Sequence, residues 1–337
     1  MKRRILEAAR RSGALTLAGS WFGRHRLTVL AYHRIADPQE AGFIGLERNV
    51  SATPEEFGEQ LDWIADRFSI VGLSDVVGAV AGGSLPDRPL LITFDDGYRD
   101  NLTTALPMLR DRDLTATIFL AAGLVGTRRL FWWDRIAELF RRAVPGRYEL
   151  PLLGTVEWED AVGRESVVDR WVEAAKKKPF DDLEEAAGAV PAVLGVPDAD
   201  AADGLLLDWE DVAAMAGAGI EFGAHTCDHP ILTRVGPDRA RREVEESVDA
   251  VSQALGVRVT AFAYPNGGRD DFDASVQQLV SDAGVKVAFS LLAGPARASE
   301  LTASPLALPR VYIHHGDGLT RFAAKVQGLP RLLRSFG

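Results

Sequence analysis

Residues 90–100 read LLITFDDGYRD, and they give the first indication of the fold. An apolar, β-prone run, Leu90–Phe94, ends directly in two adjacent carboxylates, Asp95 and Asp96, followed by Gly97. A strand without polar alternation is typical of a parallel sheet that is covered on both faces. Adjacent buried acids repel each other, and their burial costs free energy unless a metal ion or a shared proton neutralises them. The stretch therefore predicts a buried parallel strand that ends at a functional site.

Further short apolar runs recur along the chain, with helical patterns between them. Thr53 stands before Pro54 and two acids, which is typical of a helix start. Residues 237–255 have apolar side chains at helical spacing and end at Gly256. Alternating strands and helices predict an α/β fold, and about seven strands favour a closed barrel over an open sheet. The further runs cover residues 27–32, 115–120, 220–224, 259–263, 285–290 and 306–313.

Residues from about 135 to 205 break this alternation. They are charged and helical in pattern, and they contain no clear parallel strand. We interpret them as a helical insertion between two barrel units. Such an insertion either covers the active-site mouth and shapes substrate choice, or is a solvated decoration without a binding role. The expected organisation is a basic N-terminal segment (1–26), a barrel with this insertion (27–316) and a basic C-terminal tail (317–337).

Composition narrows the class of protein. The chain has 337 residues, 47% of them hydrophobic, and a net charge of -10 that argues against a nucleic-acid binder. Its single cysteine, Cys227, excludes an internal disulfide. We identify no signal peptide and no membrane span, so a cytoplasmic location is expected. The basic ends of the chain are either solvated or make a peripheral contact with a membrane or a lipid-linked substrate.

Polar residues follow the ends of several predicted strands, where a parallel barrel places its catalytic groups. Five of the six histidines fall there. Two histidines and one carboxylate form a catalytic metal site, and His225 and His229 can meet one ion if their segment turns. The second carboxylate would then act as a general base beside a metal-activated water. The residues at this predicted rim are His33, Asp95, Asp96, His225, His229, Tyr264, Pro265, Asn266, Arg310, His314 and His315.

Three motifs resemble those of a known family. TFDDG (93–97) and HTCDHP (225–230) resemble the first two motifs of the polysaccharide deacetylases, the NodB-homology or carbohydrate esterase family 4 group. FAYPNGG (262–268) resembles the third motif as it occurs in the poly-N-acetylglucosamine deacetylase branch. The resemblance covers roughly residues 27–315, apart from the insertion. It implies a distorted (β/α)7 barrel and a metal-dependent deacetylase that acts on a carbohydrate.

The resemblance also implies roles for individual residues. It makes Asp95 the general base and the backbone N–H of Asn266 the oxyanion donor. Zinc is the first expectation for the metal, and cobalt, nickel and iron also suit such ligands. The implied metal ligands are Asp96, His225 and His229.

Two positions depart from the family pattern. The arginine that orients the base in the third motif is replaced by Ala263. Arg310, on the last predicted strand, is the candidate substitute, with a purely structural arginine as the alternative. The general acid maps to His33, within the Tyr-His pair of this branch, and His314 is the second candidate. A hydrogen-bonded structural histidine is the alternative for His33.

Several residues are expected to contact the substrate. Trp133, in FWWD (131–134), forms either an aromatic wall for sugar stacking or part of the core beneath the insertion. The expected reaction is hydrolysis of the acetamido group of an N-acetylhexosamine. The alternatives are a hydrolase of an O-acetyl ester or another C–N bond, and a non-catalytic carbohydrate-binding protein. The expected substrate contacts are Tyr264, Pro265, Trp133 and His314.

Overall fold

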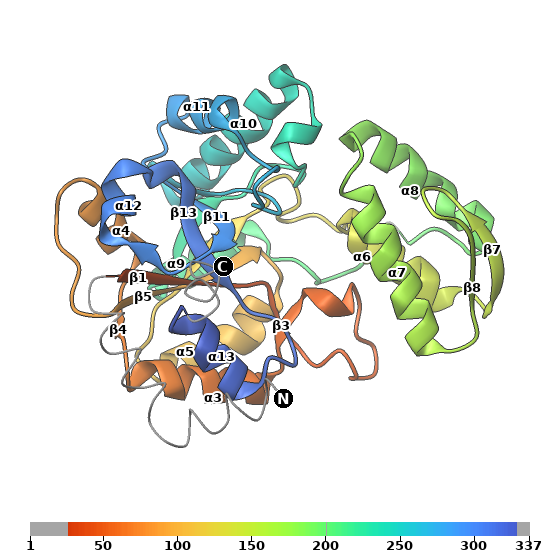
Figure 1. Ribbon diagram of the computed structural model, residues 1–337, viewed down its shortest axis with the longest axis horizontal. Coiled ribbons are helices and arrows are strands. Elements are labelled where there is room, and N and C mark those ends of the chain that lie inside the picture. Colours follow the sequence, from red (N-terminus) through yellow and green to blue (C-terminus); the bar gives the residue numbers. More distant parts are fainter. Residues whose placement is uncertain (1–25, 200, 329–337) are drawn as a thin grey trace, which may run out of the picture.

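Seven parallel strands form a closed barrel in the computed structural model, which describes residues 26–199 and 201–328 (Figure 1). The first strand, β1, pairs in parallel with both β5 and β13, and these two pairings close the ring. Each of the seven predicted runs contains one barrel strand, which confirms the predicted fold. In order round the barrel the strands are β1 (Arg26–Tyr32), β13 (Leu308–Tyr312), β11 (Val287–Ala293), β10 (Ala261–Ala263), β9 (Glu221–Ala224), β6 (Thr117–Leu120) and β5 (Pro89–Asp96).

Side chains at alternate strand positions fill the barrel interior. Successive side chains of a strand point to opposite faces, so Leu91, Thr93 and Asp95 share one face of β5. By the same rule, Leu308 and Arg310 share one face of β13. This alternation therefore directs Asp95 and Arg310 into the barrel from two different strands. The buried interior cluster includes Leu27, Val29, Leu91, Phe119, Val287, Phe289 and Leu308.

Gly223 on β9 leaves space for the ring of Phe119. A Cβ at position 223 would lie 2.4 Å from Cε1 of Phe119. We expect Gly223→Ala to lower the free energy of unfolding by about 1–3 kcal/mol, because an added methyl group forces a packed core to shift. Urea titration measures the loss. Gly188→Ala is the control, because an added Cβ there meets no atom within 4 Å; equal unfolding midpoints for the two variants would contradict the prediction.

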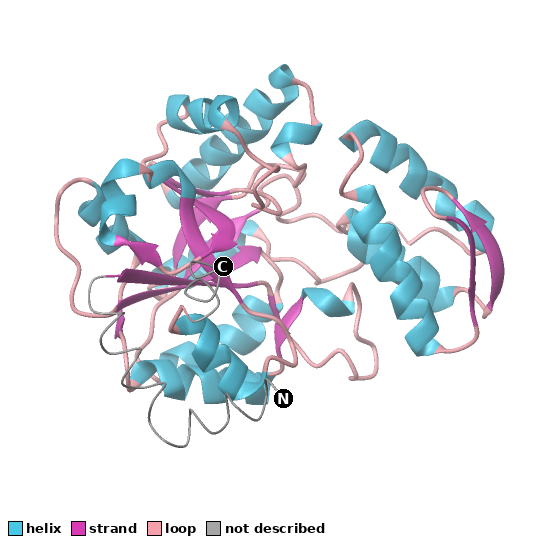
Figure 2. Ribbon diagram, viewed as in Figure 1, coloured by secondary structure: helices cyan, strands magenta, loops and turns pink. Residues whose placement is uncertain are grey.

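Helices surround the barrel (Figure 2). The predicted helix start at Thr53 is confirmed by a capping box with Glu56, and the predicted 237–255 helix ends at Gly256 in the left-handed region. The covering helices are α3 (Pro54–Ala65), α4 (Leu73–Val80), α5 (Leu106–Arg110), α9 (Trp209–Gly217), α10 (Pro237–Leu255), α11 (Ala274–Asp282), α12 (Ala298–Ala303) and α13 (Gly318–Val326).

Short elements complete the barrel ends. They include a π-helical turn, η2, directly after the acid pair, and two 3-10 turns, η1 and η3, that reach the same end of the barrel as the acids. These elements are β2 (Arg34–Ile35), η1 (Glu47–Asn49), β3 (Val50–Ala52), β4 (Ser69–Ile70), η2 (Asn101–Ala105), η3 (Leu232–Arg234), β12 (Ala296–Arg297) and η4 (Pro305–Ala307).

Between β6 and β9 the chain leaves the barrel and forms a separate lobe, on the right in Figure 1. The lobe has its own buried cluster, centred on side chains such as Phe140 and Trp171. It also contains an antiparallel hairpin that the helical pattern of the sequence does not predict. The lobe comprises α6 (Trp132–Arg142), β7 (Gly146–Leu150), β8 (Gly154–Trp158), α7 (Ala161–Ala175) and α8 (Phe180–Leu194).

The two predicted terminal segments are only partly described. The basic N-terminal segment lies outside the described residues, apart from Arg26. Of the C-terminal tail the structure describes residues 317–328, which include α13. Phe322 of α13 is fully buried and belongs to the same hydrophobic cluster as the buried apolar side chains of α3. Over residues 26–199 and 201–328, no helix combines the length and the apolar character needed to cross a bilayer.

Candidate active site

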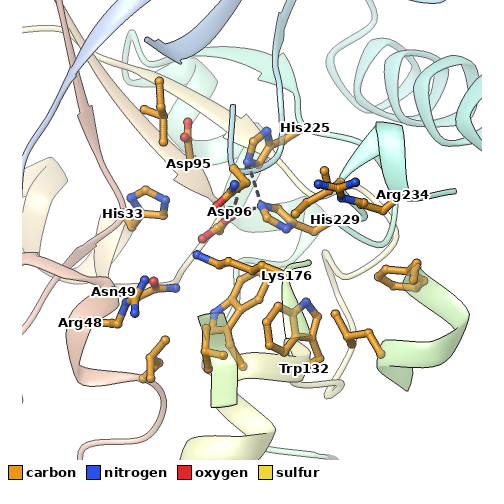
Figure 3. A pocket seen from close by; sticks show the side chains of 18 of the residues that line it. His33, Arg48, Asn49, Asp95, Asp96, Trp132, Lys176, His225, His229 and Arg234 are labelled. Atoms are coloured by element: carbon orange, nitrogen blue, oxygen red, sulfur yellow. Dashed lines mark hydrogen bonds and ion pairs between the residues drawn. The ribbon is translucent and has the colours of Figure 1, made fainter. Parts of the chain in front are cut away.

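The ends of the barrel strands meet the lobe at a cavity of about 430 Å³, which we call the rim cavity (Figure 3). This volume is in the range of small-molecule sites. Barrel residues form its floor, and residues from α6, α7 and α8 contribute one wall. The predicted site residues that line it are His33, Asp95, Asp96, Trp133, His225, His229, Asn266 and His314.

Asp96, His225 and His229 converge in this cavity, with one ligand atom of each within 4.8 Å of the others. Oδ1 of Asp96 lies 3.3 Å from Nε2 of His229 and 3.6 Å from Nε2 of His225. Nδ1 of His225 lies 2.6 Å from the carbonyl oxygen of Ala263. That nitrogen therefore donates the ring hydrogen, and the lone pair on Nε2 is left for the cavity.

The same three residues fit a divalent cation. Both carboxylate oxygens of Asp96 are buried, and no group in the described residues donates a hydrogen bond to them. Burial, and next the neighbouring Asp95, raises the pKa of Asp96. Burial also lowers the pKa of both histidines, so each ring is held neutral. A bound cation would stabilise the charged form of Asp96, whose burial otherwise costs free energy. It would also accept the free lone pairs of the two histidine rings. Their role as ligands remains a prediction.

The backbone is strained at this site. Asp96, His229 and Asn266 have φ values of 77°, 56° and 60°, in the left-handed region that non-glycine residues rarely adopt. Such conformations cost free energy and are concentrated at functional sites. Gly267, at φ 58°, approaches the neighbouring strand so closely that a Cβ would lie 2.7 Å from the backbone nitrogen of Leu291. The turn therefore directs Asn266 toward the cavity.

Asp95 is held differently from its neighbour. Nη1 and Nη2 of Arg310 each donate to one of its carboxylate oxygens at 2.7 Å, and Nη1 also lies 3.2 Å from Oγ1 of Thr93. Both partners are buried. Burial alone would raise the pKa of Asp95, but Arg310 together with His225 and His33 more than offsets the effect of burial, and the pKa lies below its ordinary value. Asp95 is thus a fixed carboxylate beside Asp96, His225 and His229. The role of Arg310 as a substitute for the missing third-motif arginine remains a prediction.

His33 lies at the end of β1. Its backbone N–H donates to Oγ of Ser51 at 2.9 Å, and its Nδ1 is buried without a partner in the described residues. Burial lowers the pKa of His33 to about 4, although Asp95 acts to raise it. The ring is therefore neutral near pH 7, and it can donate a proton to a leaving group only after receiving one. His314, the second candidate, is exposed at the cavity rim.

Two expected substrate contacts need correction. Tyr264 is 1% exposed, stacks on Phe272 and donates its hydroxyl hydrogen to the carbonyl of Leu306 at 2.8 Å. Neither Tyr264 nor the buried Pro265 lines the rim cavity. Their place directly after β10 puts them under the rim, in the core, while the next residue, Asn266, reaches the cavity. No described residue accepts a hydrogen bond from the Asn266 backbone N–H, so this donor is available to a ligand.

Trp133 lies both in the core of the lobe and at the cavity, the two positions that the sequence left open. It is 5% exposed, within the buried cluster of the lobe, yet it also lines the cavity. The ring centroids of Trp133 and His229 are 4.7 Å apart in a T-shaped arrangement, and Nε1 of Trp133 donates to the hydroxyl of Tyr98 at 2.9 Å. A contact between Trp133 and substrate remains a prediction. The neighbouring Trp132 is more exposed and also lines the cavity.

Tyr98 links Trp133 to a buried carboxylate. Its hydroxyl donates to Oδ2 of Asp134 at 2.6 Å while it accepts from Trp133. We expect Tyr98→Phe to lower the free energy of unfolding by about 1–3 kcal/mol, because two buried polar groups lose their partner. Urea unfolding measures this. The control is Tyr148→Phe, whose hydroxyl donates to the exposed carbonyl of Val144 and should matter little. A loss no greater for Tyr98→Phe than for this control would exclude a supporting role for the network.

Sequence reasoning missed the basic residues of the cavity. Arg48, Lys176, Lys178 and Arg234 all line it. They lie on short turns and on the lobe, away from the strand ends where a parallel barrel places its catalytic groups. The only sequence signal for them is the lysine run at residues 176–178, which is followed by Pro179 and Phe180.

Comparisons with known proteins agree with this geometry. The family model described as polysaccharide deacetylase matches residues 82–288, more than half of the chain. The curated protein YxkH of Bacillus subtilis (strain 168) is 24% identical over 121 residues. That alignment covers 35% of this chain and 40% of YxkH, so it spans less than half of either protein.

Solved structures share the fold over most of the chain. The deacetylase PplD of Streptococcus pyogenes superposes with a TM-score of 0.59 at 19% identity, over 90% of this chain and 99% of PplD. IcaB of Ammonifex degensii gives 0.57 at 21% identity, over 90% and 97%. A de-N-acetylase of Aggregatibacter actinomycetemcomitans gives 0.58 at 14% identity, over 89% and 99%. At these identities the likeness establishes the fold alone.

Proposed function

This chain belongs to the polysaccharide deacetylase family, and we propose that it hydrolyses the acetamido group of an N-acetylhexosamine with the help of a divalent metal ion. One observation carries the proposal. Asp95 and Asp96 are adjacent in sequence but have opposite surroundings: Arg310 donates to both oxygens of Asp95, whereas Asp96 has no hydrogen-bond donor among the described residues and lies beside His225 and His229. This division gives one carboxylate for proton transfer and one for a cation, as hydrolysis by an activated water requires.

Descriptions of the structural neighbours support the choice of bond. PplD is described as a deacetylase in complex with acetate, and the Aggregatibacter protein as a de-N-acetylase. Acetate is the acid product that hydrolysis of an acetamide releases. An O-acetyl ester would give the same acid, so the two reactions differ only in the leaving group.

Asp96, His225 and His229 are the residues that would hold the metal ion. Zinc is the first candidate, and cobalt, nickel and iron accept the same ligands. When bound, the ion supplies Lewis-acid polarisation of the acetyl carbonyl and of water. The chain provides the ligands from two elements: Asp96 ends β5, and the two histidines follow β9.

The other residues move the protons and hold the developing charge. Asp95 accepts a proton as the water oxygen bonds to the acetyl carbon, and Arg310 keeps both carboxylate oxygens oriented. The Asn266 backbone N–H donates to the carbonyl oxygen as it becomes negative. Because the resting ring of His33 is neutral, it must first receive the proton that Asp95 took from the attacking water before it can protonate the nitrogen. The C–N bond then breaks, and the products are acetate and an amino sugar.

Acetate release from a panel of N-acetylated and O-acetylated saccharides tests the proposal. The assay is run with added zinc or cobalt and with a chelator as control, and metal content is measured in parallel. Metal-dependent release from the N-acetylated members supports it. Preference for O-acetyl esters would move the function to an esterase. Absence of both release and bound metal would leave a non-catalytic carbohydrate-binding protein.

A further inference from the structure

The rim cavity holds positive charge that deacetylation does not use. Arg48, Lys176, Lys178 and Arg234 line it, although the whole chain carries a net charge of -10. We propose that the substrate carries a phosphoryl group next to its N-acetylhexosamine, and that Lys176 and Arg234 bind it. The inference rests on the proposed function, because it names the substrate class of the same cavity.

Arg234 has no partner for its charge among the residues that the structure describes. It ends η3, and its guanidinium makes no hydrogen bond or ion pair with any residue in the described ranges, while its Nε is buried. Figure 3 shows the side chain beside His229. Leaving a half-buried guanidinium unpaired costs free energy, which a bound anion recovers. Arginine binds phosphate through two parallel N–H donors, so the group suits a phosphoryl oxygen pair.

Lys176 approaches the catalytic centre from the lobe. Figure 3 shows its amino group pointing toward Asp96. Its nearest acidic atom is Oε1 of Glu173, at 3.7 Å, which is too long for a hydrogen bond. Glu173 is also hydrogen-bonded to Arg48, so one carboxylate serves two cations. The ammonium of Lys176 is therefore available to a ligand.

The carboxylates that line the cavity do not neutralise these cations. Asp95 is paired with Arg310, and Asp96 faces the two histidines. A neutral acetamido sugar would leave Arg234 unpaired, and Lys176 would have only the Glu173 carboxylate that it shares with Arg48. A phosphate monoester carries between one and two negative charges at neutral pH and offers three strong acceptor oxygens. It satisfies a lysine and an arginine together, whereas a sugar carboxylate supplies a single charge.

An apolar wall lies next to the basic residues. The cavity is also lined by three apolar side chains of the lobe: Val172, which precedes the lysine run in sequence, and Phe180 and Leu183, which follow it. The phosphoryl group can therefore come from a simple sugar phosphate, a nucleotide sugar whose base meets this wall, or a lipid diphosphate whose chain does. All three present the same phosphate ester chemistry to Lys176 and Arg234.

A matched pair of substrates tests the inference. We expect a kcat/KM for acetate release from N-acetylglucosamine 1-phosphate at least about tenfold above that from methyl N-acetylglucosaminide, in line with one charge-assisted hydrogen bond or more. Arg234→Gln and Lys176→Gln should each reduce this ratio about tenfold, mainly through KM for the phosphate, and added salt should reduce it in the native enzyme. Lys177→Gln is the control, since Lys177 is exposed and does not line the cavity.

The outcomes separate this inference from the proposed function. Acetate release without preference for the phosphate, and without an effect of either variant on the ratio, overturns the phosphoryl site and leaves the deacetylase intact. If no saccharide releases acetate, calorimetry with N-acetylglucosamine 1-phosphate still decides: binding that Arg234→Gln weakens tenfold supports the site, and unchanged or absent binding overturns it. UDP-N-acetylglucosamine and prenyl-diphosphate N-acetylglucosamine are then assayed beside N-acetylglucosamine 1-phosphate. The substrate with the highest kcat/KM identifies the source of the phosphate.

Discussion

Replacing Asp95 with asparagine lowers kcat for acetate release by about 10²- to 10⁴-fold, the range expected when a general base is lost. The amide keeps the size and shape of the carboxylate but cannot accept the proton of the attacking water. Metal binding should persist, because Asp96, His225 and His229 are untouched. Steady-state assays and elemental analysis of the purified variant measure the two quantities together. Near-native acetate release would remove Asp95 from the role of base.

Stability must be separated from chemistry in this variant. Asp95 forms a buried ion pair with Arg310, and breaking such a pair by changing one partner costs about 3–5 kcal/mol. Asp100→Asn is a matched control, because Asp100 is paired with the buried guanidinium of Arg34 at 2.8 Å and does not line the cavity. The control should lower the unfolding temperature and leave kcat close to native. Similar losses of kcat in both variants would attribute the effect to folding.

Replacing His229 with alanine removes one of three ligands, and we expect at least a tenfold loss of metal affinity and about a 10³-fold loss of activity. Metal content after dialysis and acetate release measure the two effects. A chelator should reproduce the loss in the native chain and lower its unfolding temperature, because the cation binds the folded state alone. Readdition of zinc should restore both quantities in the native chain.

His315→Ala is the control for this experiment. His315 lies at the same end of the barrel, but its Nδ1 is 3.1 Å from Oε2 of Glu56 and it does not line the cavity. The control should keep its metal and its activity. A His229→Ala protein that retains a full complement of metal and native turnover would exclude the proposed ligand set.

The barrel could be predicted because its strands are buried on both faces. Continuous runs such as Leu90–Phe94 have few alternative structures, and each run became one strand. The strand-end rule then placed His33, Asp95 and the two histidines at a common rim, since parallel strands end on one side. Arg310 was found in the same way, from its position on the last run. Side chains of a strand alternate between its two faces, and this alternation predicts the face on which Arg310 lies.

The remaining features depend on local geometry that no short pattern contains. Tyr264 and Asn266 are two residues apart, yet one is in the core and the other lines the cavity, because the turn between them passes into a left-handed conformation. The hairpin of the lobe is half exposed and lacks a strong apolar period. Lys176 and Arg234 reach the cavity from elements far apart in sequence, so only the packed lobe brings them together.

The pairing of Asp95 with Arg310 has a consequence for how the protein is made on the ribosome. Asp95 lies on β5, early in the chain, whereas its guanidinium partner Arg310 belongs to β13, the last strand to close the ring. A nascent chain that has emerged only as far as residue 307 has both histidines and both aspartates, but its barrel is open and Asp95 has no counter-charge. On the proposed mechanism, hydrolytic competence arrives late in synthesis, after the final strand has docked between β1 and β11.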